Sequence, residues 1–419
     1  MNIWILQHYA TPPDTVSGTR HFNFAKMLVE YGHDVTIFAC GFNHSTLKEE
    51  RLKKGEIFRL ECIQGVRFLW IKAPSYRGND WRRVLNMITY SASAYIMAGR
   101  LNQKPTIIWA SNPHLFSGLT GHLLAKKFKA HFLFEVRDLW PQVFVDIGAF
   151  SPRHPVILSL RIIERFIYRH AELIITLMDK ASDYLEEYGV ERGKISYLPH
   201  GIDVEMFQSS KSELPPEIFD GIGREKEKGK LIVGYLGAHG IADALETIVD
   251  CCARLQTMGR RDIHFVLIGH GSEKLRIEQK ARGMKLENIS FFQAVPKNSV
   301  PAVIKLFDMA IVSKKDSPLY KYGTSFIKTF DYMACGVPIL WAVNAPDCPV
   351  REAECGLAVP AEQPKEMAEA VVSLADMDDE IRKAIGQRGL NYVMIRHDNR
   401  VLGQRLKQLF QGICTKPYS

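Results

Sequence analysis

The 419-residue sequence lacks a long apolar run, and none approaches the roughly 20 residues that a helix needs to span a bilayer. It also lacks paired cysteines. The eight cysteines are spread along the chain without a C-x-x-C pair, which argues against a zinc site or a disulfide framework and favours a reducing compartment. The first residues, MNIWIL, carry no basic leader and predict a strand instead of a signal peptide. We therefore expect a cytoplasmic protein.

The composition is that of a globular protein, with 46% hydrophobic and 24% charged residues. A chain of 419 residues is too long for one ordinary core, so two domains are expected. The formal net charge of +8 is a mild basic excess. It favours anionic partners such as nucleotide phosphates or acidic lipid, and nothing in the sequence indicates nucleic acid.

Short apolar runs alternate with helical patterns in both halves of the chain, which predicts parallel sheets covered by helices. A polar stretch at 208–230, with Pro215-Pro216 and alternating charges, predicts a linker between domains 1–207 and 231–395. Residues 396–419 predict a helix that returns to the first domain. The predicted strands are 2–6, 34–39, 66–71, 106–110, 132–136, 173–176 and 195–198, then 231–236, 264–268, 289–292, 309–312 and 338–341.

One stretch, residues 319–339, combines features of an anion-binding site. A turn containing Tyr322, Gly323, Thr324 and Ser325 opens a helical run whose apolar residues face one way. Backbone N–H groups at such a helix start favour a bound anion. Three positions apart on this run, Lys328 and Asp331 are close enough to act on one ligand, which suggests a sugar nucleotide. The alternative is a capped amphipathic helix that only packs.

Other glycine-containing turns follow predicted strands and also favour phosphate. They hold Gly18 in the first half, and Gly237 to Gly240 with His239, followed by Gly269, in the second. Neither turn of the second half matches the dinucleotide fingerprint. The alternative for Gly18 is a structural glycine.

Polar residues also follow strands of the first half, where ligands bind in parallel sheets. Arg137 and Asp138 follow strand 132–136 and predict contact with substrate, the alternative being an Arg–Asp pair that closes the loop. His114 follows strand 106–110 and is a weaker candidate, because a lone histidine is more often structural.

Two basic amphipathic segments, 77–104 and 153–169, predict peripheral contact with an anionic membrane. The alternative is a pair of ordinary helices with a solvated basic face. No histidine and carboxylate cluster has metal-ligand spacing, and Asp376-Met377-Asp378 is better explained as a solvated helix end than as a metal motif.

These segments together resemble the retaining glycosyltransferases of family 4, which have the GT-B fold: two Rossmann-like parallel-sheet domains facing across a cleft. The resemblance covers nearly the whole chain. It is carried by SGTRHFNFAKMLVEYGHDVTIF (17–38), LPHGIDVEMF (198–207), FVLIGHGSEKLRIEQKA (265–281), ISFFQAVPKNSVPAVIKLFDMAIV (289–312) and YGTSFIKTFDYMACGVPIL (322–340). The segment FEVRDLWPQVFVDIGAF (134–150) resembles more narrowly the bacterial N-acetyl-fucosamine transferases of surface-polysaccharide assembly.

The resemblance implies transfer of a sugar from a nucleotide sugar, UDP-linked, with retained anomeric configuration and no metal or cofactor. The acceptor would be a glycan or a polyprenyl-diphosphate-linked sugar. Donor-binding roles fall by family position on Gly18, Gly237, His239, Gly240, Gly269, Val295, Tyr322, Thr324, Ser325, Phe326, Lys328 and Asp331. Among these, Asp331 would bind the ribose, Lys328 and the amides of 324–326 the diphosphate, and the Val295 backbone the base. Catalytic contact falls on Lys328, Arg137 and Asp138, and acceptor contact on Arg137, Asp138 and His114.

The chain departs from the family pattern in two places. Many relatives carry a Glu-x7-Glu pair, whereas here the two positions are Gly323 and Asp331. Many also place Arg and Lys after the first strand of the second domain, where this chain has Gly-Ala-His-Gly. Two other functions therefore stay open: a sugar-nucleotide 2-epimerase that does not hydrolyse its substrate, and a non-catalytic partner subunit of the same fold.

Overall fold

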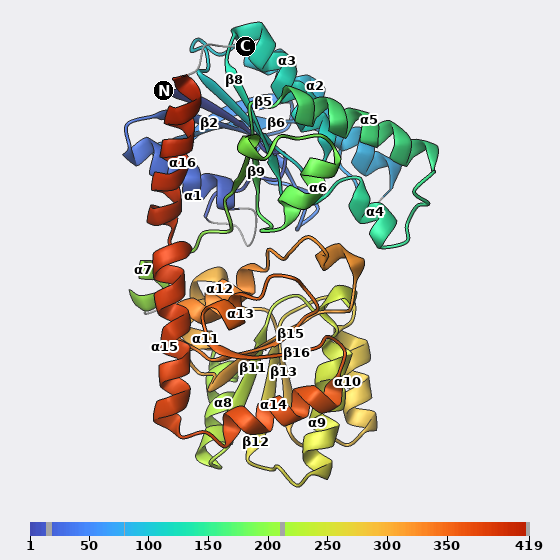
Figure 1. Cartoon of the computed structure of the whole chain (residues 1–419), viewed down its shortest axis with the longest axis vertical. Coiled ribbons are helices and arrows are strands. Elements are labelled where there is room, and N and C mark those ends of the chain that lie inside the picture. The colour runs from blue at the N-terminus through green and yellow to red at the C-terminus, as the bar shows by residue number, and fades with distance from the viewer. Residues whose placement is uncertain (14–18, 79, 210–213, 416–419) are drawn as a thin grey trace. The chain divides into compact units, whose positions relative to one another are not determined.

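The computed structural model describes residues 1–13, 19–78, 80–209 and 214–415. The chain forms two compact units (Figure 1). The first comprises residues 1–201 and the segment that begins at Asn399, and the second comprises Ile202–Asp398.

The first unit is built on a mostly parallel sheet. Its strands are β1 (Asn2–Leu6), β2 (Asp34–Cys40), β5 (Phe58–Ile63), β6 (Val66–Ile71), β7 (Ile107–Ser111), β8 (His131–Val136), β9 (Leu173–Thr176) and β10 (Ile195–Tyr197). They are ordered β10-β9-β8-β7-β1-β2-β6-β5, and β5 alone runs antiparallel to its neighbour. A small antiparallel pair, β3 (Phe42–Asn43) and β4 (Lys48–Glu49), lies apart from it.

Helices cover both faces of this sheet (Figure 1). They are α1 (Arg20–Glu30), α2 (Trp81–Ala98), α3 (Leu115–Phe128), α4 (Gln142–Asp146), α5 (Pro155–His170), α6 (Ala181–Glu187) and α16 (Asn399–Cys414). Helix α16 packs on α1, and its Phe410 ring lies 5.9 Å from Trp109 on β7. The next residue on β7, Ala110, faces α3 on the other side, where a side chain at Gly121 would meet it at 2.7 Å.

The second unit is also α/β. Its strands are β11 (Leu231–Leu236), β12 (Ile263–Ile268), β13 (Ile289–Phe292), β14 (Met309–Ser313), β15 (Ile339–Ala342) and β16 (Gly356–Val359), all parallel in the order β13-β12-β11-β14-β15-β16. Its helices are α7 (Val204–Ser209), α8 (Pro216–Glu227), α9 (Leu245–Thr257), α10 (Lys274–Gly283), α11 (Val300–Ile304), α12 (Ile327–Ala334), α13 (Pro349–Glu352), α14 (Pro364–Ala375) and α15 (Asp379–Arg396). The predicted α/β class is confirmed, and each predicted strand is present with its ends shifted by at most one residue.

The predicted linker at 208–230 is wrong. Helix α8 forms there and buries Ile218 and Ile222, four residues apart, in the core of the second unit. The alternating charges of this segment lie on the exposed side of α8. Its polar composition is therefore that of a solvent-facing helix surface and not of a loop. Helix α7 likewise buries Val204 and Phe207 in the second core, so the boundary falls at Gly201 instead of residue 207.

Candidate active site

The turn before α12 presents backbone donors at a helix start. Gly323 has φ +105°, a left-handed conformation that glycine tolerates and side chains do not. The helix N-cap, Phe326, provides no side-chain cap, and the first turn holds no acidic residue. Within the described part of the chain, the amides of Ser325 and Phe326 have no hydrogen-bond acceptor. These donors and the helix dipole make the turn a good site for an anion.

The amide of Thr324 is already engaged. Both its N–H and its hydroxyl donate to one oxygen of Asp347, at 2.9 and 3.0 Å. The expectation that this amide holds a diphosphate is therefore wrong for this conformation, because a carboxylate of the chain already occupies that donor. Asp347 lies in the loop that follows the carboxyl end of strand β15. That position is the one feature of the sequence that could have identified it as a candidate site residue.

Lys328 belongs to a compact charged cluster. Its Nζ donates to Tyr235 Oη at 2.6 Å and to Asp243 Oδ1 at 3.0 Å. Lys314 Nζ donates to the same Asp243 oxygen at 2.8 Å. Two ammonium groups thus share one carboxylate, and the cluster keeps a positive charge beside the start of α12. Burial lowers the pKa of Lys328 to about 8, so it is still mostly charged at neutral pH.

The sequence did not single out Asp243. Burial raises the pKa of this carboxyl, but Lys328 and Lys314 outweigh burial and lower the pKa below its usual value. The carboxylate therefore stays ionised and holds both ammonium groups. It is a positioning residue for Lys328.

The glycine turns after β11 and β12 pack against each other, which gives their glycines structural reasons. A side chain at Gly269 would meet the carbonyl oxygen of Gly237 at 1.8 Å, so Gly269 permits backbone packing. A side chain at Gly237 would approach Lys328 Nζ to 2.9 Å, so Gly237 leaves room for the lysine. Gly240 lies farther along the same turn, where an added side chain would reach Asp243 at 3.4 Å.

His239 is fully buried, contrary to its predicted contact with the donor. Its ring is 0% exposed, and neither ring nitrogen has a hydrogen-bond partner within the described residues. Burial, with a contribution from Lys274, lowers its pKa to about 4, so the ring is neutral. It supplies no charge to a diphosphate.

Asp331 lies on α12, one turn beyond Lys328. Its carboxyl makes no hydrogen bond within the described chain. Burial raises its pKa to about 7, against the opposing effects of Lys297 and Lys328. Because Lys297 follows Val295 by two residues, this electrostatic contact brings the loop after β13 to the same region as α12. Contact of Val295 and Asp331 with one ligand stays a prediction.

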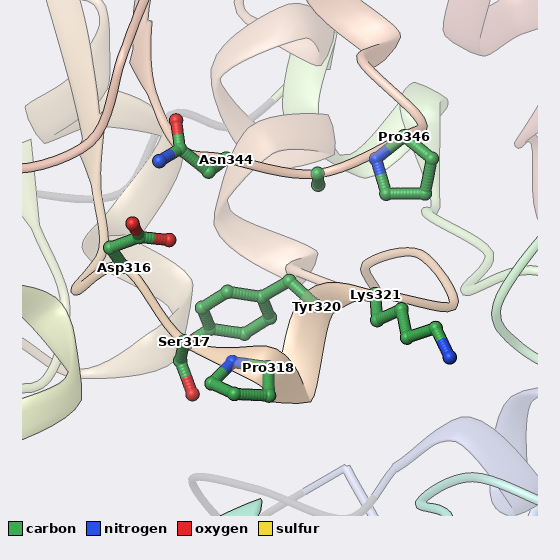
Figure 2. Close-up of a pocket in the computed structure, with 8 residues that line it drawn as sticks. Asp316, Ser317, Pro318, Tyr320, Lys321, Asn344 and Pro346 are labelled. Carbon is green, nitrogen blue, oxygen red and sulfur yellow. The ribbon is translucent and has the colours of Figure 1, made fainter.

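A hollow of about 490 Å³ lies beside the α12 turn and was not predicted from the sequence. The loops after β14 and β15 line it with Asp316, Tyr320, Lys321 and Asn344 (Figure 2). Tyr322, next to Lys321, accepts a hydrogen bond from that lysine at 3.2 Å. Polar groups of both loops therefore flank the predicted donor site.

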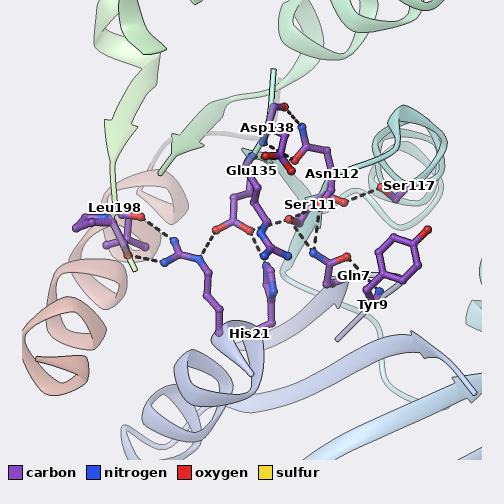
Figure 3. A network of polar contacts seen from close by, with 12 residues as sticks. Gln7, Tyr9, His21, Ser111, Asn112, Ser117, Glu135, Asp138 and Leu198 are labelled. Carbon is purple, nitrogen blue, oxygen red and sulfur yellow. Dashed lines mark hydrogen bonds and ion pairs between the residues drawn. The ribbon is translucent and has the colours of Figure 1, made fainter. Parts of the chain in front are cut away.

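In the first unit, Arg137 and Asp138 directly follow β8. Figure 3 shows Asp138 beside the buried polar network that contains Asn112, Ser111 and Glu135. The Arg137 amide donates to Asn112 Oδ1 at 2.8 Å, and Asn112 Nδ2 donates to the Asp138 carbonyl. The alternative of an Arg137–Asp138 ion pair is not observed among the described residues. Both side chains line a cavity of about 480 Å³.

His114 does not line that cavity. It is 1% exposed, its Nδ1 accepts the Ser117 amide as the cap of α3, and its Nε2 lies 2.8 Å from His8 Nδ1. The predicted acceptor contact is thus not supported, because capping and burial use the whole ring. Gly18 lies outside the described residues.

Among the described residues, no group of three or more His, Cys, Asp or Glu side chains is arranged to hold a metal ion. Asp376 pairs with Arg260 at 2.7 Å and Asp378 caps α15, as expected of helix ends. No helix within these residues is long and apolar enough to cross a bilayer.

Solved structures share the fold at low identity. Sucrose-phosphate synthase from Thermosynechococcus elongatus matches with a TM-score of 0.74 and 15% identity, covering 99% of both chains. Anabaena HepE, solved in complex with UDP-glucose, matches with a TM-score of 0.68 and 13% identity, covering 98% of this chain and 100% of that one. These likenesses establish the GT-B architecture.

Sequence comparison assigns both units. Residues 17–201 match the glycosyl transferase 4-like domain, and residues 230–377 match glycosyl transferases group 1. A protein of Escherichia coli (strain K12) named as a colanic acid biosynthesis glycosyl transferase, WcaI, is 23% identical over 267 residues, 62% of this chain and 63% of its own length. The chain belongs to the glycosyltransferases, with a glycosyl transferase 4-like domain followed by a group 1 domain.

Proposed function

We propose that the protein is a retaining glycosyltransferase that moves a sugar from a UDP-sugar to a lipid-linked or surface-polysaccharide acceptor. The observation that carries the proposal is the arrangement around α12: amides of Ser325 and Phe326 without acceptors, the charged Lys328, and the Asp331 carboxylate. Together they match the anionic diphosphate and the ribose hydroxyls of a nucleotide sugar.

The chemistry follows from charge. In sugar transfer, the transition state resembles an oxocarbenium ion, and negative charge builds on the leaving diphosphate. Fixed amides and an ammonium group aimed at that charge lower the barrier without a protein acid. We assign no protein base, and in this proposal the donor's own phosphate accepts the acceptor's proton. The pathway needs no metal or other cofactor.

Similarity to other proteins supports the choice of substrates. HepE was solved with UDP-glucose, which favours UDP as the nucleotide, and the name of WcaI refers to colanic acid biosynthesis. The resemblance of residues 134–150 favours an N-acetylated deoxyhexosamine as the transferred sugar.

Transfer is tested with the full chain, a panel of UDP-hexosamines and lipid-linked sugar acceptors. The expected result is UDP release that depends on the acceptor, with an NMR spectrum of the product that shows retained anomeric configuration. Epimers of the UDP-sugar formed without acceptor would instead identify a 2-epimerase. UDP binding without any product across the panel would identify a non-catalytic subunit.

The membrane part of the proposal concerns three adjacent helices of the first unit. Helix α3 packs between α2 and α5. Together the three contain one acidic residue, Glu164, which is 0% exposed. Their exposed side chains include large apolar residues and cations such as Arg82, Lys126 and Arg165. A face that is apolar and basic without exposed acids suits an anionic bilayer. We place the protein at the inner face of the cell membrane.

We expect the full chain to float with phosphatidylglycerol vesicles at low salt and to be released at high salt. Ile162, which is 71% exposed on α5, would enter the bilayer interface, so Ile162→Glu should weaken vesicle binding at least about tenfold. The control is Ile395→Glu, which changes an equally exposed residue, also 71%, on α15 of the second unit. Equal retention of both variants, or none of the parent protein, would contradict the proposal.

The raised pKa of Asp331, about 7, predicts that donor affinity depends on pH. Below pH 7 the carboxyl is mostly neutral, and above it is an anion that accepts hydrogen bonds from two ribose hydroxyls. UDP affinity should therefore rise about tenfold between pH 6 and pH 8 through this group. Calorimetry measures it as the difference between the parent protein and Asp331→Asn, because ionisation of UDP itself cancels in that difference. A difference that does not change with pH would remove Asp331 from the ribose site.

A further inference from the structure

The cavity at the carboxyl edge of the first unit's sheet is lined by many residues besides Arg137 and Asp138. Its volume is about 480 Å³, and its walls come from the loops after β1, β2 and β8, together with α2 and α4. The cavity is described within the first unit alone, and its walls carry chemistry that the site in the second unit does not use.

The walls combine cations, aromatic faces and an apolar end. The guanidinium groups belong to Arg51, Arg83 and Arg137. Arg51 lies 5.1 Å from the ring centre of Trp70, and the guanidinium of Arg83 lies 6.0 Å from that of Tyr9. Aromatic faces suit the apolar side of a sugar ring, and guanidinium groups suit phosphate or carboxylate. The apolar end consists of Val143, Phe144 and Ile147 on and after α4.

Two carboxyl groups, those of Glu50 and Asp138, also line the cavity, but among the described residues neither forms an ion pair with Arg137. The buried carboxylate of Glu135 already accepts from Arg20 at 2.9 Å, His21 at 2.6 Å and Ser111 at 2.7 Å. No ion pair involves Arg137 within the described residues, and its buried Nε has no hydrogen-bond partner there. Asn112 holds the Arg137 backbone in place, and no ion pair within the described residues neutralises the guanidinium group.

Two further buried polar atoms of the cavity lining make no hydrogen bond of good geometry within the described chain, although Asn86 lies near the first residue and Arg83 and Tyr76 lie near the second. They are Nε2 of His8 and the hydroxyl of Tyr9. His8 is fixed between Tyr9 and Tyr90, with ring centres 4.4 and 4.3 Å away, and burial lowers its pKa well below the usual value. A buried polar atom without a partner costs stability, so a rigid neutral ring held in this way is suited to hydrogen bonding with a ligand hydroxyl.

We propose that this cavity binds the sugar of the acceptor that carries an anionic group, either phosphate or carboxylate. Arg137 contacts the anion, the aromatic walls contact the sugar ring, and His8 and Tyr9 bond its hydroxyls. The ligand's role as acceptor rests on the proposed transferase function. The binding of an anionic sugar does not, because it needs no turnover.

Calorimetry on the full chain tests the site with three probes: glucose 1-phosphate, glucuronate and glucose. At least one anionic probe should bind about tenfold or more tightly than glucose, and the tighter of the two identifies phosphate or carboxylate as the group recognised. Arg137→Gln should remove that preference. The matched control is Arg192→Gln, which changes an exposed arginine of the same unit, 72% accessible.

A second variant locates the binding. Lys328→Ala should leave binding of the anionic probe unchanged, because Lys328 belongs to the second unit. Loss of binding in Lys328→Ala, equal binding of glucose and both anions, or absence of anion binding would overturn the inference. If an anionic sugar binds through Arg137 and no transfer occurs with any donor, the cavity stands and only the proposed transferase function fails.

Discussion

Lys328→Ala is expected to lower kcat for sugar transfer at least about tenfold, and up to about a thousandfold. Lys328 is the cation that would meet the diphosphate as its negative charge grows, and Tyr235 and Asp243 hold its Nζ in place. The turn after β11 offers no other cation, since His239 is buried and neutral. The measurement is initial rate at saturating UDP-sugar, with UDP affinity determined separately by calorimetry.

A loss of activity in Lys328→Ala has to be distinguished from a loss of the folded structure. Asp243 keeps Lys314 as a partner when Lys328 is removed, so no carboxylate is left buried alone and the melting temperature should change little. Lys365→Ala removes an exposed lysine, 66% accessible, from α14 of the same unit and should leave the rate unchanged. Near-normal turnover in Lys328→Ala would refute its role in stabilising the leaving group.

The positioning role of Asp243 has a separate signature. Asp243→Asn removes the charge that holds Lys328 and Lys314, and in the desolvated site the pKa of Lys328 should fall further. The rate should then decline from a lower pH than in the parent protein, because Lys328 loses its proton earlier. A purely structural role would lower the rate without moving the pH profile.

Short-range sequence patterns predicted the strands and helix starts whose formation depends on residues close together in the chain. Strands such as β8 and β12 are buried along their full length, so their apolar runs identified them in the sequence. The edge strands β5 and β16 were not predicted. The start of helix α12 was predicted correctly, since turn and helix lie within one short segment, and its role as a donor site stays a prediction.

Contacts between distant residues escaped prediction. Lys314 and Lys328 follow Asp243 by 71 and 85 positions, and no local pattern joins them. The same holds for Asp347, which meets Thr324 only through the packing of adjacent strands. Gly323 shows what comparison of motifs alone cannot detect. It stands where many relatives have the first glutamate of the Glu-x7-Glu pair, and its φ of +105° is a backbone conformation that a glutamate rarely adopts.

The buried network beneath the first unit's cavity predicts the largest effect on stability. Glu135 is 0% exposed and pairs with Arg20 and His21 (Figure 3). Arg20 also donates to the carbonyls of Leu198 and Pro199, which ties β8 to the end of the unit. Burial opposes ionisation of Glu135, but Arg20 and His21 lower its pKa well below the usual value. Glu135→Leu should therefore lower the free energy of unfolding by about 3–5 kcal/mol, because it leaves Arg20 buried and charged.

Thermal unfolding followed by tryptophan fluorescence measures this effect, since every tryptophan except Trp341 lies in the first unit. The transition should fall by roughly 6–20 °C. Glu187→Leu, at an exposed position on α6, is the control and should shift it by less than about 2 °C. In the double variant Glu135→Leu/Arg20→Met no buried charge is left unpaired, so its loss should be smaller than the sum of the two single losses. Additive losses would mean that Arg20 reaches water when Glu135 is removed, and that the network does not depend on this ion pair.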